Sequence, residues 1–329
     1  MHHRNVVLLT LFLSILAVVA CISAPALADD APLSVERERG LKPKDVFKEC
    51  DACPEMVVVP AGSFTMGSPD NEKDRNKDES PQHGVTIARP FAVGKFEVTL
   101  DQFAAFVKET GYDAGSECFT FEQGKGEKRS GRSFRNPGYG QNGSHPAACV
   151  NWDDAKAYVG WLSRKTGKTY RLLTEAEWEY AARARTTPGS APRFYFGDDE
   201  KAMCRYGNGA DQTAKKSIPG AANWPVLSCD DGYAYTAPVG SFTANAFGLY
   251  DMHGNVWEWT EDCYHDSYRG APTDGSAWTA GDCKYRVVRG GSWSFDSGHL
   301  RAANRVRDAS GSRFVDYGLR VARTLTGLH

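Results

Sequence analysis

Apolar residues recur at helical spacing in three stretches of the chain, and each stretch begins at a residue able to cap a helix. The capping residues are Thr99, Asn151 and Thr174, and Gln102 and Glu177 complete two capping boxes. The apolar faces comprise Phe103, Phe106 and Val107, then Ala155, Tyr158, Val159 and Leu162, then Trp178, Ala181 and Ala182. This spacing predicts three amphipathic helices that pack against the core.

Two other stretches favour strands. MVVVPAGSFTMGS begins at Met56 and VTIARPFAVGKFEV begins at Val85, and both are rich in β-branched and apolar residues. The charged stretch between them, Ser68–Ser80, predicts a solvated loop. From Thr186 onward turn residues dominate, and long irregular stretches in a compact domain usually carry function or extra stabilisation. With 33 glycines, 8 tryptophans and 14 tyrosines, the chain favours a loop-rich fold over layers of helices.

The N-terminal residues follow a pattern of their own. Val6–Ala20 is an apolar run without charge, and Ala26–Ala28 offers a small-residue cleavage motif, so residues 1–28 are expected to be a signal peptide. A membrane anchor, for which the run is short, and a lipoprotein cleavage site at Cys21 are the alternatives. We expect no membrane span and a periplasmic or secreted protein. Residues 29–47 are charged and predict a flexible arm ahead of a domain over residues 48–326.

Eight cysteines follow the predicted cleavage site, and an even number in an exported chain favours disulfides. Pairing in chain order would join Cys50 with Cys53, Cys118 with Cys149, Cys204 with Cys229, and Cys263 with Cys283. Because eight cysteines can pair in many ways, order alone leaves the pairing open. Free thiols or a zinc site are the alternative.

Charge and motifs exclude several classes of protein. Loss of Arg4 with the leader changes the formal net charge from −2 to −3, which is unlike a nucleic-acid-binding surface. The eight histidines form no H-E-x-x-H pattern, and the chain has no G-x-S-x-G elbow, P-loop or dinucleotide fingerprint. These absences disfavour a zinc hydrolase, a serine hydrolase and a nucleotide-binding enzyme.

The stretch DMHGNVWEW favours a hard cation. Asp251 and Glu258 flank a glycine turn, and the carbonyls of Gly254 and Val256 could join their carboxylates around calcium, which prefers six to eight oxygen ligands. A similar cluster could form from the residues Asn208, Gly209, Asp231 and Tyr233. Loops rich in Asp, Asn and Gly are more often simple turns, so the spacing alone is a weak signal.

Seven segments in the same order resemble the formylglycine-generating enzyme (sulfatase-modifying factor) family. They are MVVVPAGSFTMGS, KFEVTLDQFAAF, NWDDAKAYVGWL, RLLTEAEWEYAARA, TAPVGSFTANAFGLYDMHGNVWEWTEDC, RVVRGGSW and YGLRVAR, and they span about Glu55 to Arg323. The resemblance implies a single, irregular α+β domain related to the C-type lectin fold. It also implies two calcium sites at the two clusters above.

The resemblance implies further that family enzymes oxidise a cysteine of an unfolded sulfatase segment, with a copper ion held by two cysteines after the Gly-Gly-Ser turn. Counted from Gly290, these positions are Phe295 and Leu300 here. Soft Cu(I) suits thiolates, which neither residue offers. We therefore expect no copper and no copper-cysteine mechanism.

Polar residues of the same stretch are candidates to line a substrate groove, although no catalytic residue is assigned. They are Ser292, Trp293, Asp296, His299, Arg301, Asn304 and Arg305. The structural alternative is that Arg301 and Arg305 only pair with acidic neighbours.

Two functions follow from the resemblance. Relatives without the cysteine pair include a pyoverdine-maturation protein, so the first is an exported, oxidoreductase-like maturation factor that holds a peptide or protein near Ser292. The second is a non-catalytic, lectin-like module that binds a partner protein or glycan. The sequence names neither the substrate nor the oligomeric state.

Overall fold

Two antiparallel-rich sheets form the centre of the molecule. The structure is a computed structural model that describes Met1, residues 31–185 and residues 191–326. The larger sheet has the order β1 (Val46–Phe47), β2 (Met56–Val59), β5 (Phe91–Gly94), β13 (Val321–Thr324), β8 (Tyr170–Leu172). The second has the order β11 (Arg305–Ala309), β10 (Tyr285–Arg289), β9 (Trp257–Cys263), β12 (Tyr317–Gly318), and only the β9–β12 pair is parallel.

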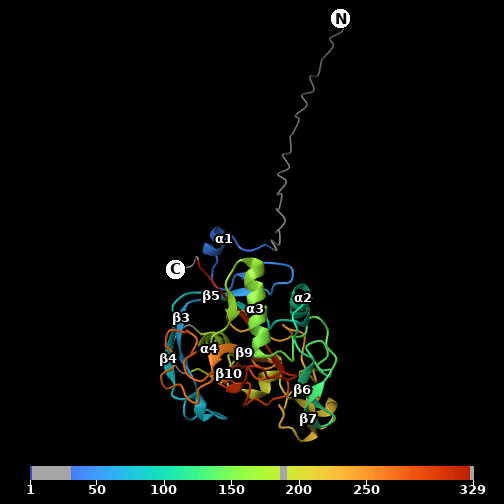
Figure 1. Ribbon diagram of the computed structural model, residues 1–329. Helices are drawn as coiled ribbons and strands as arrows, with labels where there is room; N and C mark the ends of the chain where they lie inside the picture. The colour runs from blue at the N-terminus through green and yellow to red at the C-terminus, as the bar shows by residue number, and fades with distance from the viewer. Residues whose placement is uncertain (2–30, 186–190, 327–329) are drawn as a thin grey trace.

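Two hairpins lie on opposite sides of these sheets in Figure 1: β3 (Gly62–Met66) with β4 (His83–Ile87), and β6 (Glu117–Glu122) with β7 (Lys125–Ser130). The stretch VTIARPFAVGKFEV is split into β4 and β5 by Pro90, because proline cannot donate a ladder hydrogen bond. The sequence did not predict the β6–β7 hairpin, whose second strand is almost entirely charged or polar.

All three predicted helices are confirmed. They are α2 (Leu100–Thr110), α3 (Trp152–Thr166) and α4 (Glu175–Arg183), and Thr99, Asn151 and Thr174 cap them with complete capping boxes. Their apolar residues join the core, with Phe103, Tyr158 and Trp178 essentially unexposed. Two short helices, α1 (Val35–Arg39) and α5 (Gln212–Ser217), and 3-10 turns at Lys77–Glu79, Glu200–Arg205 and Ala221–Asn223 complete the described helices.

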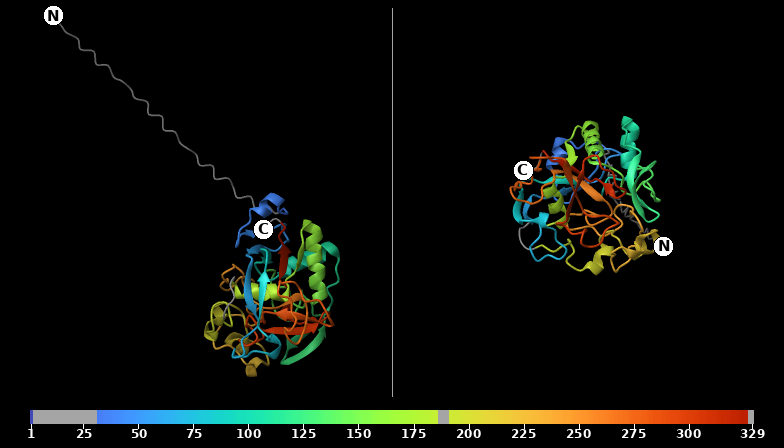
Figure 2. Two further views of the ribbon diagram at one scale, coloured as in Figure 1. Left: turned by 90° about the vertical axis from the view of Figure 1, so that its left-hand side faces the viewer. Right: turned by 60° about the horizontal axis from the view of Figure 1, so that its bottom comes forward.

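The described part of the predicted arm is docked on the domain. Leu33 is buried in the main core, and Glu38 accepts hydrogen bonds from Arg323 (2.7 Å) and from the backbone N–H of Thr326 (2.6 Å). Figure 2 shows α1 at the same end of the molecule as the last strand. Leu33 and Phe47 are buried in the main core, so apolar contacts dock this segment together with the ion pair of Glu38. The predicted signal peptide and Cys21 lie outside the described residues, apart from Met1.

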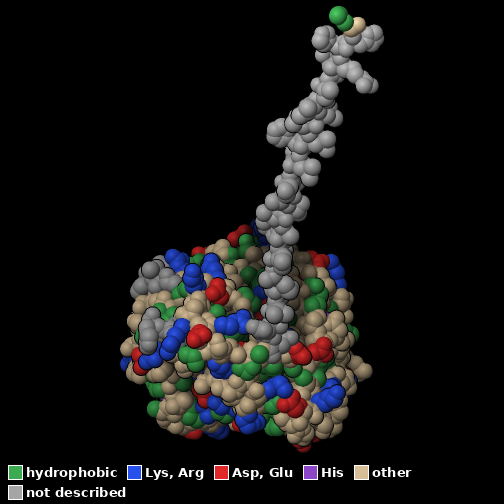
Figure 3. Space-filling view, turned by 90° about the horizontal axis from the view of Figure 1, so that it is seen from above, with side chains coloured by type: hydrophobic (Ala, Val, Ile, Leu, Met, Phe, Trp, Pro, Cys, Tyr) green, Lys and Arg blue, Asp and Glu red, His purple; other side chains and the backbone are tan. Residues whose placement is uncertain are grey.

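The eight described cysteines form four disulfides, Cys50–Cys53, Cys118–Cys149, Cys204–Cys229 and Cys263–Cys283, as chain order suggested. Among the described residues no helix is long and apolar enough to span a membrane. Basic and acidic side chains are interspersed on the face shown in Figure 3.

Buried ion pairs join distant segments of the fold. Arg301 meets Glu79 (2.6 Å), Arg305 meets Glu175 (2.7 Å), and Arg323 meets both Glu38 and Glu49, while none of these side chains is more than slightly exposed. The alternative interpretation of Arg301 and Arg305, that they pair with acidic neighbours, is therefore confirmed. Both pairs are buried, so each depends on its partner to offset desolvation.

Replacing Arg323 with methionine should destabilise the protein strongly, because Glu38 and Glu49 would then be buried without their guanidinium. We expect the free energy of unfolding to fall by about 3–5 kcal/mol in denaturant titrations. Lys128→Met is the matched control, since Lys128 and its partner Glu117 are exposed and such a pair contributes about 1 kcal/mol or less. Equal losses in the two variants would contradict this view of Arg323.

Candidate functional site

The two glycines of the Gly-Gly-Ser turn after β10 are packed so closely that larger residues would not fit at their positions. Gly290 and Gly291 have φ of 103° and 78°, and a Cβ on Gly291 would lie 2.4 Å from Leu300. The N–H of Gly254 donates to the carbonyl of Gly290 (2.8 Å), which ties the turn to the DMHGNVWEW stretch. The turn therefore fixes where Ser292 and the next residues point.

Ser292 and Ser294 both donate to one oxygen of Asp316. The Oγ–Oδ2 distances are 2.7 Å and 2.9 Å, and Asp316 lies just before β12. Burial raises the pKa of Asp316, and the two serine hydroxyls oppose that rise. An acid of this kind can accept or return a proton near neutral pH more readily than an exposed one.

Asp316 lines a pocket of about 360 Å³, here called the aromatic pocket. Its other polar lining residues are Thr120 and Ser294, and its remaining residue is Val315. The aromatic lining residues are Phe119, Phe121, Trp224, Trp293, Phe295, Phe314 and Tyr317. A pocket of this size with an apolar wall and few polar groups is typical of a ligand-binding site.

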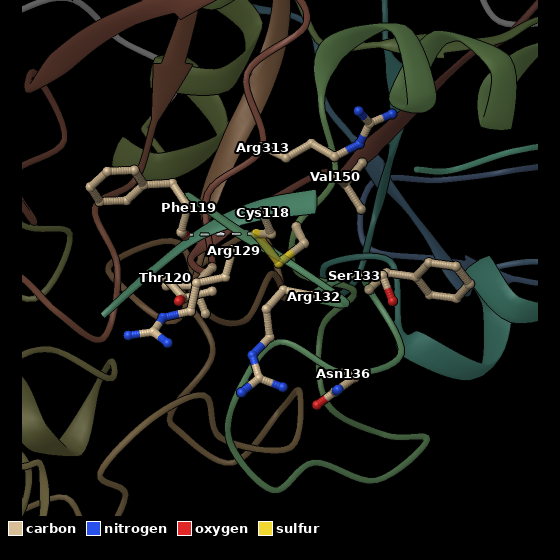
Figure 4. The surroundings of a disulfide bond; sticks show 12 residues. Cys118, Phe119, Thr120, Arg129, Arg132, Ser133, Asn136, Val150 and Arg313 are labelled. Carbon is tan, nitrogen blue, oxygen red and sulfur yellow. Dashed lines mark hydrogen bonds between the residues drawn. A yellow bond between two sulfur atoms is a disulfide. The ribbon is translucent and has the colours of Figure 1, made fainter. Parts of the chain in front are cut away.

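The β6–β7 hairpin supplies one wall of the aromatic pocket, and a disulfide holds it there. Cys118 of β6 is bonded to Cys149, ahead of α3, and both sulfur-bearing residues pack in a cluster with Trp293 and Val315. Figure 4 shows this disulfide with Phe119 next to it on β6. Phe119 also receives and donates backbone hydrogen bonds with the strand-like segment at Arg313 and Val315.

The structure separates the candidate groove residues of the sequence analysis. Trp293 lines the aromatic pocket, and Ser292 is buried behind it in contact with Asp316. Asp296 and His299 form a partly exposed pair (3.0 Å). Asn304 is buried, and its Oδ1 has no hydrogen-bond partner. Arg301 and Arg305 are engaged by buried glutamates and do not line the pocket.

The two positions expected for copper ligands have different surroundings. Phe295 lines the aromatic pocket and packs edge-on against Trp257, with ring centroids 5.5 Å apart. Leu300 is fully buried in an apolar cluster with Phe194 and Met203. All eight cysteines of the described chain are in disulfides, so none of them offers a free thiol.

The first predicted calcium cluster has the oxygen atoms that a cation needs. Asn208 Oδ1 and Asp231 Oδ2 are buried without a hydrogen-bond partner. Burial, together with the nearby carboxylate of Asp211, raises the pKa of Asp231 to about 8. Asp211, which the sequence analysis did not single out, is fully buried and lies within ligand distance of Asp231. Asp211 accepts from the N–H groups of Ala214 and Asp231, and the two carboxylates lie within 4.8 Å of each other. This close pair of acids, with unpartnered oxygens on Asp231 and Asn208, fits a hard cation.

The second predicted cluster fits a cation through different atoms. Asp251 Oδ1 is buried without a partner, but Glu258 is already engaged by Arg320 (2.7 Å) and by the indole N–H of Trp178 (2.6 Å). Glu97 is buried beside them, and burial and the neighbouring acids raise its pKa well above its usual range. Three acids therefore share one guanidinium, which leaves excess negative charge.

One asparagine joins the two clusters. Asn255 Oδ1 accepts from Asn208 (3.3 Å), its Nδ2 donates to Glu97 (2.6 Å), and its backbone carbonyl accepts from the N–H of Trp293 (3.0 Å). A Cβ on Gly254 would lie 1.9 Å from the carbonyl oxygen of Asn208, so the loops pack directly against each other. The clusters thus support the turn that carries Ser292.

Sequence reasoning missed Asp316, Asp211, Glu97 and the aromatic wall residues Phe119 and Phe314. Asp316 directly precedes the YGLRVAR segment, and Glu97 lies inside KFEVTLDQFAAF, so both positions were inside quoted segments or next to them. Asp316 contacts Ser292, 24 residues away in the sequence, and Glu97 contacts Val256, more than 150 residues away. No pattern of nearby residues reveals such contacts.

Comparisons with known proteins cover nearly the whole described chain. Residues 42–325 match the model of the sulfatase-modifying factor enzyme 1-like domain. PvdO from Pseudomonas aeruginosa, a solved structure, has a TM-score of 0.73 and 44% identity over 87% of this chain and 100% of its own. The formylglycine-generating enzyme of Streptomyces coelicolor is 32% identical over 78% of this chain and 83% of its own.

The serine/threonine-protein kinase Pkn1 of Chlamydia trachomatis is 32% identical over 88% of this chain. The match covers 40% of the kinase, so the chain spans about two fifths of the length of this relative.

Removing the Cys118–Cys149 disulfide should open the aromatic pocket as well as destabilise the protein. We expect Cys118→Ala/Cys149→Ala to lose about 3 kcal/mol of unfolding free energy and to make the pocket tryptophans more accessible to acrylamide quenching. Cys50→Ala/Cys53→Ala is the control, because this disulfide closes a short loop distant in sequence from the pocket wall. Unchanged quenching in the first variant would show that the disulfide does not position the hairpin.

Proposed function

Because the chain belongs to the sulfatase-modifying factor enzyme 1-like family, which includes the formylglycine-generating enzymes, we propose that it is a maturation factor acting on a peptide or protein. The observation that carries this proposal is the buried carboxylate of Asp316, which the family's Gly-Gly-Ser turn holds at the wall of an aromatic pocket. The chain is 44% identical to PvdO and 32% identical to a formylglycine-generating enzyme, and a role in maturation is the proposal common to both similarities.

The chemistry proposed for the pocket is proton transfer coupled to oxidation of the bound segment by molecular oxygen. The segment loses two protons and two electrons, and the oxygen takes up both to become hydrogen peroxide. The aromatic rings bind one side chain of the substrate and exclude water, which strengthens electrostatic interactions within the pocket. Asp316 then takes a proton from the bound group, and Ser292 and Ser294 keep the carboxylate oriented toward it. Thr120 and Ser294 are the remaining polar groups that can position the substrate.

The reaction is proposed to proceed without the copper-cysteine pair. Phe295 presents an aromatic ring to the pocket, and Leu300 is sealed in an apolar cluster, so neither supplies a soft ligand for Cu(I). The described cysteines are all engaged in disulfides and cannot replace them.

We further propose that the protein is exported and binds calcium at the two acidic clusters. The apolar N-terminal run favours export, and disulfides persist in oxidising compartments such as the periplasm. Asn208, Asp211 and Asp231 would hold one ion, and Asp251 with Glu97 and the carbonyls of Gly254 and Val256 would hold the other. Bound calcium would supply the positive charge that these buried acids lack.

The proposed activity predicts a mass difference in the exported peptides of the host. A strain lacking the gene, or complemented with Asp316→Asn, should accumulate a peptide that is heavier by two hydrogen atoms than its product in the wild type. Loss of proton transfer should lower turnover by about a hundredfold or more. Asp70→Asn, at an exposed acid outside the pocket, should restore the product. Mass spectrometry that finds no such pair, while a stable partner co-purifies, would favour the non-catalytic binding module.

The copper-free mechanism predicts that the purified protein will not make formylglycine. A peptide with the motif C-x-P-x-R, incubated with the protein and Cu(I), should show no aldehyde by hydrazide labelling. The double variant Phe295→Cys/Leu300→Cys should gain Cu(I) binding if these are the metal positions. Aldehyde formation by the unaltered protein would refute the proposed mechanism.

Chelation should lower the melting temperature, because an ion bound only by the folded state stabilises it by mass action. We expect EDTA to reduce Tm by about 5 °C or more, with recovery when calcium is restored. Asp231→Asn should lose only the part of this response that the first site contributes. Asp230→Asn should keep the whole response, because Asp230 is exposed and its contacts are with Thr213, Gly232 and, at 3.9 Å, Lys216. A Tm that is insensitive to EDTA would argue against both sites.

A further inference from the structure

Asp316, like Asp211 but unlike Glu79, Glu175 and Glu258, has no basic side chain that neutralises it. Glu79, Glu175 and Glu258 each meet a buried arginine at 2.6–2.7 Å. Within residues 31–185 and 191–326, no lysine, arginine or histidine lies within ion-pair distance of Asp316, and its partners are two serine hydroxyls. The pocket therefore contains an acid without a resident cation.

The nearest basic residue in sequence is unavailable to this acid. Arg313 makes a two-point ion pair with Asp154, at 2.9 Å and 2.8 Å, and does not line the aromatic pocket. Because Ser292 and Ser294 both donate to the same oxygen, Asp316 acts as an acceptor of hydrogen bonds, which suits its ionised form.

Aromatic faces surround the position that a ligand would take. The ring centroids of Phe119 and Phe314 are 5.0 Å apart, those of Phe121 and Trp224 are 5.0 Å apart, and those of Trp224 and Trp293 are 6.4 Å apart. Aromatic faces attract cations through their quadrupole, and the attraction grows when the cation is removed from water. Aromatic faces beside an unpaired carboxylate are the arrangement that proteins use for ammonium groups.

The pocket continues into a second depression that suits a polymer rather than an isolated amine. This depression, of about 420 Å³, shares Phe119 and Phe314 with the aromatic pocket and also carries Glu117, Lys128 and Arg313. It bears both signs of charge and lies along the exposed hairpin. An extended chain can therefore place one residue in the aromatic pocket and its neighbour in the depression.

We propose that the aromatic pocket selects a positively charged side chain of the peptide substrate, held between the aromatic faces and the Asp316 carboxylate. This inference rests on the proposed function and specifies the chemical class of the group that enters the same site. A neutral aromatic or aliphatic side chain would fill the pocket but leave the carboxylate unpaired, which costs binding energy.

Two small probes of the same shape test this selection. Phenethylammonium and 2-phenylethanol carry the same ring and chain, and only the first is a cation. Titrations followed by tryptophan fluorescence and calorimetry should give phenethylammonium at least about tenfold tighter binding to the full-length protein. Asp316→Asn should abolish the preference, whereas Asp70→Asn, at an exposed acid that lines neither depression, should preserve it.

A second variant keeps the test valid if Asp316→Asn does not fold, as judged by near-ultraviolet circular dichroism. Ser294→Ala retains Asp316 but removes one hydrogen bond donated to it. The ratio of the affinities for phenethylammonium and 2-phenylethanol should therefore fall but stay above one. Equal or tighter binding of 2-phenylethanol would overturn the cation selection and leave the pocket as a binding site. If neither probe binds, the cation selection and the proposed use of the pocket both fail.

Discussion

Buried pairs of arginine and glutamate are the interaction on which this irregular fold depends. Arg289, Arg301, Arg320 and Arg323 are essentially unexposed, and their carboxylate partners come from segments 62 to 285 residues away. Much of the described chain lies outside helices and strands. The hydrogen bonds of regular secondary structure therefore cannot hold these segments in place. The guanidinium groups also donate to backbone carbonyls, such as those of Gly94 and Asp74, which would otherwise be buried without partners.

Contacts between residues that are distant in the sequence also position the candidate site. The turn that carries Ser292 is fixed by the carbonyl contact to Gly254, and Gly254 belongs to a loop that packs on Asn208. The opposite wall comes from a hairpin that a disulfide ties to the start of α3. The pocket thus depends on the Gly254–Gly290 hydrogen bond, on the packing of Gly254 against Asn208, and on the disulfide. Asp316, which directly precedes β12, accepts hydrogen bonds from the two serines of the turn.

Local chemistry was enough to predict a substantial part of this structure. Thr99, Asn151 and Thr174 identified the helices because capping is a contact over three residues, and the ordered segments identified the family, which is confirmed. The hairpin that includes Phe119 was missed because its second strand has no apolar alternation. Asp316 and Asp211 could not be found, since their roles depend on the burial and the distant partners that only folding provides. Docking of residues 31–47 was missed for the same reason, because Glu38 owes its position to Arg323.

The contact between Glu38 and Thr326 brings the two ends of the described chain together at one pole of the molecule, while the β6–β7 hairpin lies toward the other pole (Figures 1 and 2). The Glu38–Thr326 contact and the wall of the aromatic pocket therefore lie at different ends of the domain. A surface linkage made close to Glu38 or Thr326 would therefore lie away from the hairpin that forms one wall of the pocket.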